Sequence, residues 1–231
     1  MKRFSFFLTL ILLFMAMGSF TMAQGNHEEI TLKDIYKKGK FHQKSVHGLR
    51  SMDDGIHYTV LEEGSKIIQY SYKTGKSVQI LFDASGHPEI SSFRQYEFSR
   101  NENKILVATD VHPIYRRSFT ARYYVYDRDD ETLQPLSEQG AQRLATFSPD
   151  GSKVGFVREN DLYIKNLETR EEKQITHDGE YNHIINGTTD WVYEEEFAIT
   201  QGFHWSPEGD QIAYYKFDES RVRVFHMTMY K

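Results

Sequence analysis

Three consecutive glutamates, Glu194, Glu195 and Glu196, stand in the segment TDWVYEEEF at residues 189–197. Carboxylates this close together repel one another, and an acidic run is usually a solvated surface. Two carboxylates that converge can instead hold a cation such as an ammonium group, because charge-assisted hydrogen bonds are strong. Asp190 suits the N-cap of a short helix, whose first turn favours negative charge. Spacing alone favours this capping interpretation over a cation site.

Aromatic neighbours change the setting of these acids. We expect Trp191, Tyr193 and Phe197 to bury part of the segment, so that not every glutamate can face bulk water. Adjacent residues of a helix are separated by about 100°. Two neighbouring carboxylates can therefore converge on one cation while the third points away, and the spacing leaves open which two do so.

Other chemistries lack their motifs in this chain. No G-x-S-x-G sequence occurs, so no nucleophile elbow is predicted. The TGKS sequence at 74–77 resembles the end of a phosphate loop, but Tyr70 stands where that loop needs its first glycine, so we predict a hairpin turn. His177 and His183 flank a loop without further metal-ligand spacing, and we expect them on the surface. We therefore predict no catalytic nucleophile, metal or cofactor in this chain.

Composition indicates a globular protein with a substantial core. The 231 residues are 39% hydrophobic and 14% aromatic, and the aromatic share favours strands. The formal net charge of -5 gives no support to nucleic-acid binding. The chain has no cysteine, so its stability must come from core packing alone.

The first 23 residues have the pattern of a secretory signal peptide. A basic start at Met1–Arg3 precedes an apolar run from Phe4 to Phe20, and Ala23 ends a stretch that suits signal peptidase. The apolar run is short for a membrane anchor, and Gly18 interrupts its end. We predict export, to the periplasm or the medium.

Beyond the signal peptide the sequence predicts an all-β protein. Residues 24–50 are a polar lead-in that contains one short helix, in TLKDIYKKGKF at 31–41. Residues 51–231 alternate or cluster apolar residues in short runs separated by glycine turns, which is typical of strands. These ranges are the expected domain boundaries.

An internal repeat defines the expected architecture. The segments FSPDGSKVGFV at 147–157 and WSPEGDQIAYY at 205–215 share an aromatic residue, Ser-Pro, an acid, Gly and an apolar strand. A worn copy begins at Phe98, and we assign a fainter one to residues 60–72. The serines at 99, 148 and 206 are 49 and 58 residues apart, long for a four-stranded propeller blade. We predict β-propeller blades, in which the strand after each turn is buried on both faces.

About four such blades fit in residues 51–231. A propeller closes its ring so that no strand edge is left bare, and four blades that stop in mid-blade leave the ring open. We therefore expect the front part of a longer protein; a small self-contained propeller is the alternative.

Several blocks of the chain resemble the dipeptidyl peptidase IV family of serine peptidases. The glutamate segment TDWVYEEEF resembles that family's double-glutamate motif almost residue for residue. The blocks TLKDIY, YRRSFTARYYVYD, SPDGSKVGFVRENDLYIK and HWSPEGDQIAYYKFDES resemble successive parts of its N-terminal propeller in the same order. The resemblance implies that residues 51–231 are roughly half of an eight-bladed propeller that caps an α/β-hydrolase domain outside this chain.

The resemblance also implies roles for single residues. Glu195 and Glu196 would bind the α-ammonium group of a peptide substrate, and Glu194 would be a bystander. Arg116 would contact a substrate carbonyl, with Arg117 as the second choice. The catalytic triad would belong to the hydrolase domain, so this chain alone would be inactive.

The implied activity is that of an exported serine exopeptidase that releases X-Pro or X-Ala dipeptides. Its partners would be peptides with a free N-terminus and Pro or Ala second, and a second copy of itself in a homodimer. A prolyl tripeptidyl peptidase of the same architecture is one alternative. A non-catalytic propeller that binds a protein or glycan is the other.

Overall fold

The computed structural model describes residues 29–43, 45, 47–224 and 228. The chain divides into two compact units, Met1–Val46 and His47–Lys231. The predicted signal peptide lies outside the described residues, and the domain boundaries expected at residues 23 and 50 stay predictions.

The first unit contains the expected short helix, α2 (Leu32–Tyr36). A capping box starts it: the Thr31 hydroxyl accepts a hydrogen bond from the Asp34 backbone N–H at 3.2 Å, and the Asp34 carboxylate accepts one from the Thr31 backbone N–H. Hydrogen bonds from Lys38 and Thr31 lower the pKa of Asp34 to about 2. The Asp34 carboxylate is therefore ionised and holds the first turn in place.

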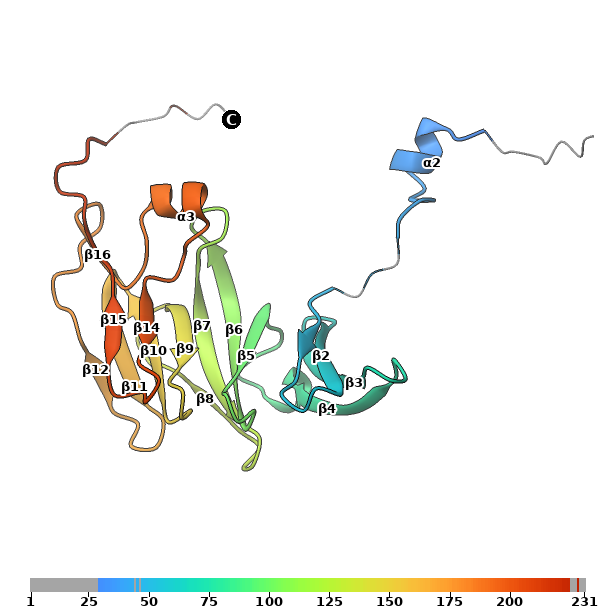
Figure 1. The fold of residues 1–231 in the computed structure, drawn as a ribbon, viewed down its shortest axis with the longest axis horizontal. Helices are drawn as coiled ribbons and strands as arrows, with labels where there is room; N and C mark the ends of the chain where they lie inside the picture. Colours follow the sequence, from blue (N-terminus) through green and yellow to red (C-terminus); the bar gives the residue numbers. More distant parts are fainter. Residues whose placement is uncertain (1–28, 44, 46, 225–227, 229–231) are drawn as a thin grey trace, which may run out of the picture. The chain divides into compact units, whose positions relative to one another are not determined.

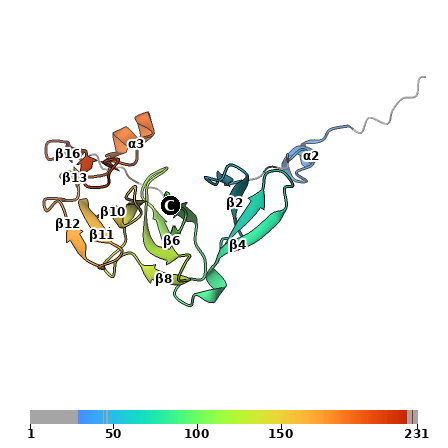
Figure 2. The same ribbon diagram turned by 60° about the horizontal axis from the view of Figure 1, so that its bottom comes forward.

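Three four-stranded antiparallel sheets follow one another along the second unit (Figures 1 and 2). In each sheet, every strand pairs only with its neighbours in sequence, which is the meander of a propeller blade. The first sheet has strands β1 (Arg50–Ser51), β2 (His57–Glu62), β3 (Lys66–Ser71) and β4 (Ser77–Asp83). The second has β5 (Gln95–Phe98), β6 (Lys104–Pro113), β7 (Phe119–Asp127) and β8 (Thr132–Pro135). The third has β9 (Arg143–Phe147), β10 (Lys153–Arg158), β11 (Asp161–Asn166) and β12 (Glu172–Gln174).

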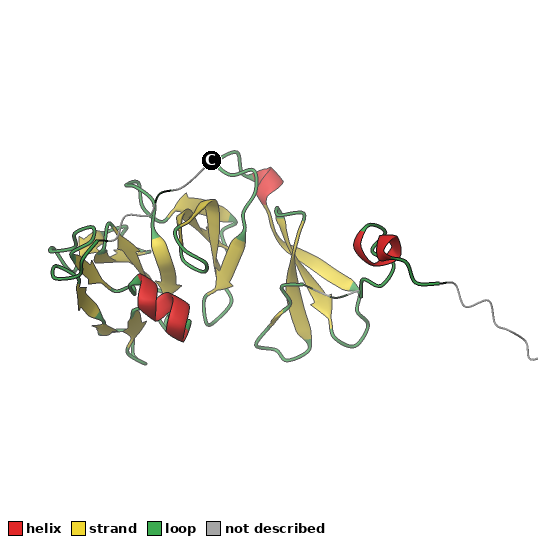
Figure 3. Cartoon of the chain, turned by 90° about the horizontal axis from the view of Figure 1, so that it is seen from above, coloured by secondary structure: helices red, strands yellow, loops and turns green. Residues whose placement is uncertain are grey.

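A fourth group of strands carries the glutamate segment. It pairs β13 (Ile184–Asn186) with β16 (Lys216–Asp218), and β14 (Phe203–Trp205) with β15 (Ile212–Tyr214). Helix α3 (Trp191–Phe197) lies between β13 and β14 in sequence. The described structure is mostly strand, with a few short helices that include the 3-10 turn η1 (Ala84–Gly86) (Figure 3). The prediction of an all-β, blade-like fold with a short helix at the glutamates is confirmed.

The sequence repeat corresponds to one recurring turn between the first and second strands of a sheet. In each copy, the serine hydroxyl accepts a hydrogen bond from the backbone N–H five residues later. The three bonds are Lys104 to Ser99 at 3.0 Å, Lys153 to Ser148 at 2.9 Å and Gln211 to Ser206 at 3.1 Å. The serine is thus a structural part of each turn, which explains why it recurs.

The fainter copy assigned to residues 60–72 is wrong. That segment is the β2–β3 hairpin, which joins the second and third strands of its sheet. The true counterpart starts at Met52, whose N–H donates to the His57 carbonyl at 3.0 Å, while the Gly55 N–H donates to the Met52 carbonyl at 3.1 Å. Sequence comparison missed it because methionine occupies the position of the serine.

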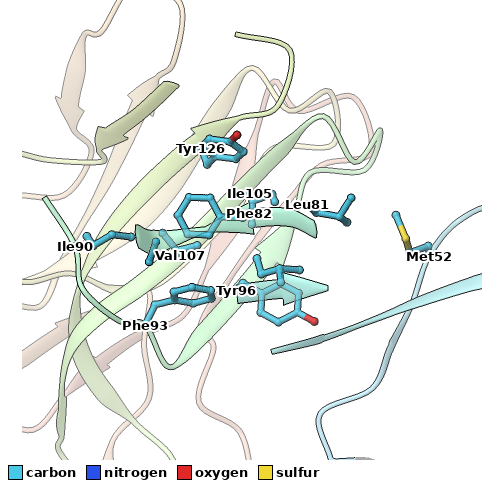
Figure 4. Packing of buried hydrophobic residues seen from close by; sticks show 11 residues of the cluster. Met52, Leu81, Phe82, Ile90, Phe93, Tyr96, Ile105, Val107 and Tyr126 are labelled. Carbon is cyan, nitrogen blue, oxygen red and sulfur yellow. The ribbon is translucent and has the colours of Figure 1, made fainter. Parts of the chain in front are cut away.

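The core lies between successive sheets. One apolar cluster joins the first two sheets, and Figure 4 shows Phe82 close to both Tyr126 and Phe93. The ring centroid of Phe82 lies 4.8 Å from that of Tyr126 and 5.5 Å from that of Phe93. A second cluster, which includes Leu106 and Phe156, joins the second and third sheets. Each fully buried aromatic or aliphatic side chain of this kind contributes about 1.5–3 kcal/mol.

The strand after the turn is buried on both faces in the second and third sheets, as predicted. Residues 105–109 of β6 and 154–158 of β10 are buried without interruption. Strand β15 differs, since Ala213 and Tyr214 are exposed. Among the described residues only β14 pairs with β15, so this strand has a neighbour on one edge alone.

The recurring turns also pack on one another. A Cβ atom added to Gly151 would lie 3.3 Å from the Cβ of Ser99 in the preceding turn, and one added to Gly209 would lie 3.3 Å from Pro149. Both glycines have left-handed backbones, with φ of +69° and +72°. The repeat therefore needs glycine for its turn conformation and for its contact with the neighbouring blade.

Substitutions of glycine separate these two demands. Gly75 has φ of +64° but open space around it, so Gly75→Ala should lower the free energy of unfolding by about 1 kcal/mol through backbone strain alone. Gly151→Ala adds the contact with Ser99 and should lower it by about 1 kcal/mol more. Gly86→Ala, which has neither feature, is the control. Urea unfolding measures all three, and a Gly151→Ala variant no less stable than Gly75→Ala would contradict the packing of turn on turn.

Candidate functional site

Helix α3 begins at the N-cap that the sequence predicts. The Asp190 carboxylate accepts a hydrogen bond from the Tyr193 N–H at 2.8 Å. Ala198 ends the helix in the left-handed conformation. The Thr189 hydroxyl donates to the Ile199 carbonyl at 2.7 Å, so the chain entering the helix is bonded to the chain leaving it. Helix α3 therefore lies in a loop whose two ends are hydrogen-bonded to each other.

The aromatic residues do not bury the glutamates as expected. Trp191, Tyr193 and Phe197 are themselves exposed, although the Tyr193 ring packs on Phe197 and on Phe217. The burial comes from a different element, the hairpin between β6 and β7. Its tip, residues 114–118, lies beside α3 (Figure 1).

The three glutamates occupy three different environments. Glu194 is 1% exposed and points into the protein. The side chain of Glu195 is 16% exposed, and Glu196 is exposed. One carboxylate of the run is thus removed from the surface, and the two others remain available to a ligand.

The two arginines of the hairpin tip reach different partners. The Arg116 Nε atom lies 3.3 Å from the Glu195 Oε2 atom, and the Arg116 side chain is 71% exposed. The Arg117 guanidinium instead donates from Nη1 to the backbone carbonyl of Glu194 at 2.9 Å. The structure therefore brings Arg116 together with Glu195 at the surface, whereas the Arg117 guanidinium binds the backbone of the helix.

Glu194 has contacts that the sequence did not reveal. Its Oε1 atom accepts hydrogen bonds from the backbone N–H groups of Arg117, at 2.7 Å, and Ser118, at 3.0 Å. These partners are 77 and 76 residues away in sequence, and backbone donors leave no signature in a sequence. Sequence reasoning therefore had no signal from which to assign Glu194 a role.

The Glu194 carboxylate stays ionised despite its burial. Burial raises its pKa, but hydrogen bonds from Ser118 and Arg117, together with the positive charge of Arg143, outweigh that effect and leave the pKa below its ordinary value. Its contribution to stability is therefore present above the ordinary pKa of a glutamate and is lost as the pH falls through the lowered value. Burial in turn lowers the pKa of Arg143, and the charge of Glu194 opposes that shift.

Two cavities adjoin the hairpin. One of about 440 Å³ is lined in part by Tyr115, Tyr181, Ile185 and Asp190, next to the start of α3. Another of about 310 Å³ lies among the first strands of the second and third sheets. Arg143 lines both. A small organic group therefore has space beside the charged residues, because both volumes fall within the usual range of ligand pockets.

The arrangement offers one cationic and two anionic groups to a small ligand. Glu195 and Glu196 can hold a cation, and the exposed guanidinium of Arg116 can donate to a carbonyl oxygen beside it. No group of three His, Cys, Asp or Glu side chains suited to a metal occurs in the part of the chain that the structure describes. The helices among those residues are also too short or too polar to cross a membrane.

The fold and the site together define a class of protein. Successive four-stranded meanders that pack sheet against sheet make a β-propeller domain, and this one carries its charged site on a helix and a hairpin outside the strands.

Comparison with known proteins gives the family. Residues 99–231 match the family described as "Dipeptidyl peptidase IV (DPP IV) N-terminal region". The chain is 32% identical to human prolyl endopeptidase FAP and 31% identical to dipeptidyl peptidase 4 of Felis catus, over 87% and 90% of its length. The crystal structure of Porphyromonas gingivalis dipeptidyl peptidase 4 matches with a TM-score of 0.79 and 41% identity over 88% of the chain. The chain belongs to the dipeptidyl peptidase IV family.

The match covers only part of each relative. The chain spans 26% of the human protein, 27% of the feline protein and 30% of the bacterial structure.

Loss of the helix cap should open α3 locally. Asp190→Ala removes the hydrogen bond to the Tyr193 N–H and should cost about 1 kcal/mol, so amide hydrogen exchange over residues 191–197 should become about fivefold faster. Arg116→Ala is the control, because an ion pair with so exposed a partner contributes little to stability. Unchanged exchange in Asp190→Ala would contradict the role of the cap, and acceleration in Arg116→Ala would contradict the minor role of the ion pair.

Proposed function

We propose that this chain is the N-terminal substrate-recognition part of an exported dipeptidyl peptidase IV-like serine peptidase. The peptidase releases X-Pro or X-Ala dipeptides from the N-termini of peptides. The observation that carries the proposal is the pairing of Arg116 with Glu195 at 3.3 Å, in a chain of this family.

In this proposal Glu195 and Glu196 bind the substrate's α-ammonium group. A peptide α-amine has a pKa of about 7.7–8.0, so it is mostly charged at neutral pH. Glu195 is largely shielded from water and Glu196 is exposed, so the ammonium would lie at the mouth of the site between them. Two carboxylates attract such a cation more strongly than one, and the partial burial of Glu195 reduces the screening of its interaction by water.

In the same proposal Arg116 binds a backbone carbonyl oxygen of the substrate, close to its N-terminus. Its guanidinium carries five N–H donors in a fixed plane, and its 71% exposure leaves it accessible to a carbonyl oxygen of the peptide. An ammonium group fixed on the glutamates and a carbonyl fixed on Arg116 define both the position and the direction of the peptide. The peptidase would then cut at a set distance from the N-terminus.

The bond-breaking groups would lie outside this chain. The proposal assigns the Ser, Asp and His of the triad to the α/β-hydrolase part of the whole protein and requires no cofactor. The purified 231-residue chain should therefore release nothing from an X-Pro substrate, and measurable turnover by it would overturn this division of labour. Export rests on the signal-peptide pattern of residues 1–23, and a homodimer of the whole protein rests on the family resemblance.

Neutral replacements of the two surface glutamates test the proposal. In the full-length peptidase, Glu195→Gln and Glu196→Gln should each lower kcat/KM on an H-Gly-Pro reporter at least about 100-fold, about 2.7 kcal/mol, because the ammonium loses a charged partner. Glu208→Gln, at an exposed acid in the turn after β14, is the matched control and should keep wild-type activity. Activity within threefold of wild type in both site variants would refute the proposal.

The same assay decides the length of the product. An enzyme whose glutamates fix the first residue should release Ala-Pro from an Ala-Pro reporter and leave an Ala-Ala-Pro reporter intact. Release of the tripeptide would favour the tripeptidyl peptidase alternative. An inactive full-length protein that still binds peptides would favour the non-catalytic one.

A further inference from the structure

We infer that Glu194, the buried glutamate of the run, is a positioning residue that fixes Arg116 beside the two substrate-binding glutamates. The inference rests on the proposed function and adds a third member to the site. Glu194 itself is 1% exposed and is therefore shielded from a substrate.

The Glu194 side chain binds the hairpin through its backbone. One carboxylate oxygen, Oε1, accepts from the N–H groups of two consecutive residues, Arg117 at 2.7 Å and Ser118 at 3.0 Å. Hydrogen bonds to a charged acceptor are about twice as strong as neutral ones. The hairpin tip is therefore fixed to one atom of α3.

The hairpin binds the helix in return. The Arg117 guanidinium donates to the Glu194 carbonyl oxygen at 2.9 Å. Arg116 directly precedes Arg117, and Glu195 directly follows Glu194, so the residues that face the ligand are the immediate neighbours of the residues that are bonded together. The hydrogen bonds of Glu194 therefore set the 3.3 Å distance between Arg116 and Glu195.

The other interactions of the hairpin cannot supply this constraint. The Arg116 side chain is too exposed for its ion pair to order two flexible side chains, since exposed pairs are worth about 0–1 kcal/mol. The bond from the Ile114 N–H to the Ser118 carbonyl closes the hairpin on itself and does not reach α3. Within the described residues, the three hydrogen bonds that join residues 114–118 to α3 all use Glu194.

The chemistry of the pocket explains why an ionised acid serves here. The two N–H donors and the nearby charge of Arg143 all favour an anion over a neutral group. A glutamine at this position keeps an oxygen that can accept from both N–H groups. An alanine removes the acceptor and leaves without it the buried N–H of Ser118 and the half-buried N–H of Arg117, and an aspartate is one methylene too short to reach both.

Kinetics of the full-length peptidase distinguish positioning from simple folding. Glu194→Ala should lower kcat/KM on an H-Gly-Pro reporter about 10- to 100-fold, and Glu194→Gln should restore it to within about fivefold of wild type. The matched control is Glu172→Ala, which removes a partly buried acid bonded to Arg158 at 2.7 Å in another sheet. Glu172→Ala should destabilise the protein and leave kcat/KM near wild type.

A double-mutant cycle with Arg116→Ala is the decisive readout. If Glu194 acts through Arg116, Glu194→Ala should reduce kcat/KM much less in the Arg116→Ala background than in the wild type. The loss in Glu194→Ala should be the same on H-Gly-Pro as on an acetyl-Pro reporter, which lacks only the amino group, because both carry the carbonyl that Arg116 contacts. Glu194→Asp replaces Glu194→Ala if the alanine variant does not fold, and the same coupling is expected.

Two outcomes would overturn the inference. One is a double variant whose loss of kcat/KM equals the product of the losses in Glu194→Ala and Arg116→Ala. The other is an equal loss of kcat/KM in Glu194→Ala and Glu172→Ala. Failure of the proposed function would look different, because Glu195→Gln would then keep wild-type activity whatever Glu194 does.

Discussion

The structure depends on one constraint: a β-sheet with apolar side chains on both faces needs another element packed against each face. In the second unit, the neighbouring sheet provides the cover. Phe82 of the first sheet packs on Tyr126 of the second, and Leu106 and Phe156 belong to the cluster between the second and third. The turns that join the first and second strands of neighbouring sheets also pack on one another, as Gly151 does on Ser99. Each blade therefore packs on the next, and segments such as the β6–β7 hairpin and α3 are not needed for this packing.

This independence from the packing is what makes a binding site possible. The strands use their side chains for packing, so the polar groups that could bind a peptide are carried by the β6–β7 hairpin and by α3. Two projecting segments 77 residues apart in sequence would move independently unless something joined them. Glu194 joins them at their base, and its two neighbouring acids stay at the surface. In our proposal, the three neighbouring acids are thus divided between a structural role for Glu194 and a recognition role for Glu195 and Glu196.

The parts of this arrangement that depend on local chemistry could be predicted from the sequence, whereas the parts set by distant contacts could not. Ser148 with its Pro-Asp-Gly turn predicted the blades, and Asp190 predicted the start of α3. Prediction failed where the cause was not local. Met52 occupies the serine position of the first turn, so the backbone repeats a pattern that the side chain hides. Trp191 was expected to shield part of the glutamate run, but it is exposed, and a hairpin distant in sequence buries Glu194 instead. The role of Glu194 rests on bonds to backbone N–H groups, which every residue except proline carries.

The most direct test of the proposed site is a crystal structure of the full-length protein with an X-Pro dipeptide bound. We expect the ammonium nitrogen to lie about 3 Å from carboxylate oxygens of both Glu195 and Glu196, with a peptide carbonyl at Arg116. Glu194 should still accept from the N–H groups of Arg117 and Ser118. An ammonium group held by other residues, or a Glu194 side chain turned out to contact the ligand, would contradict it.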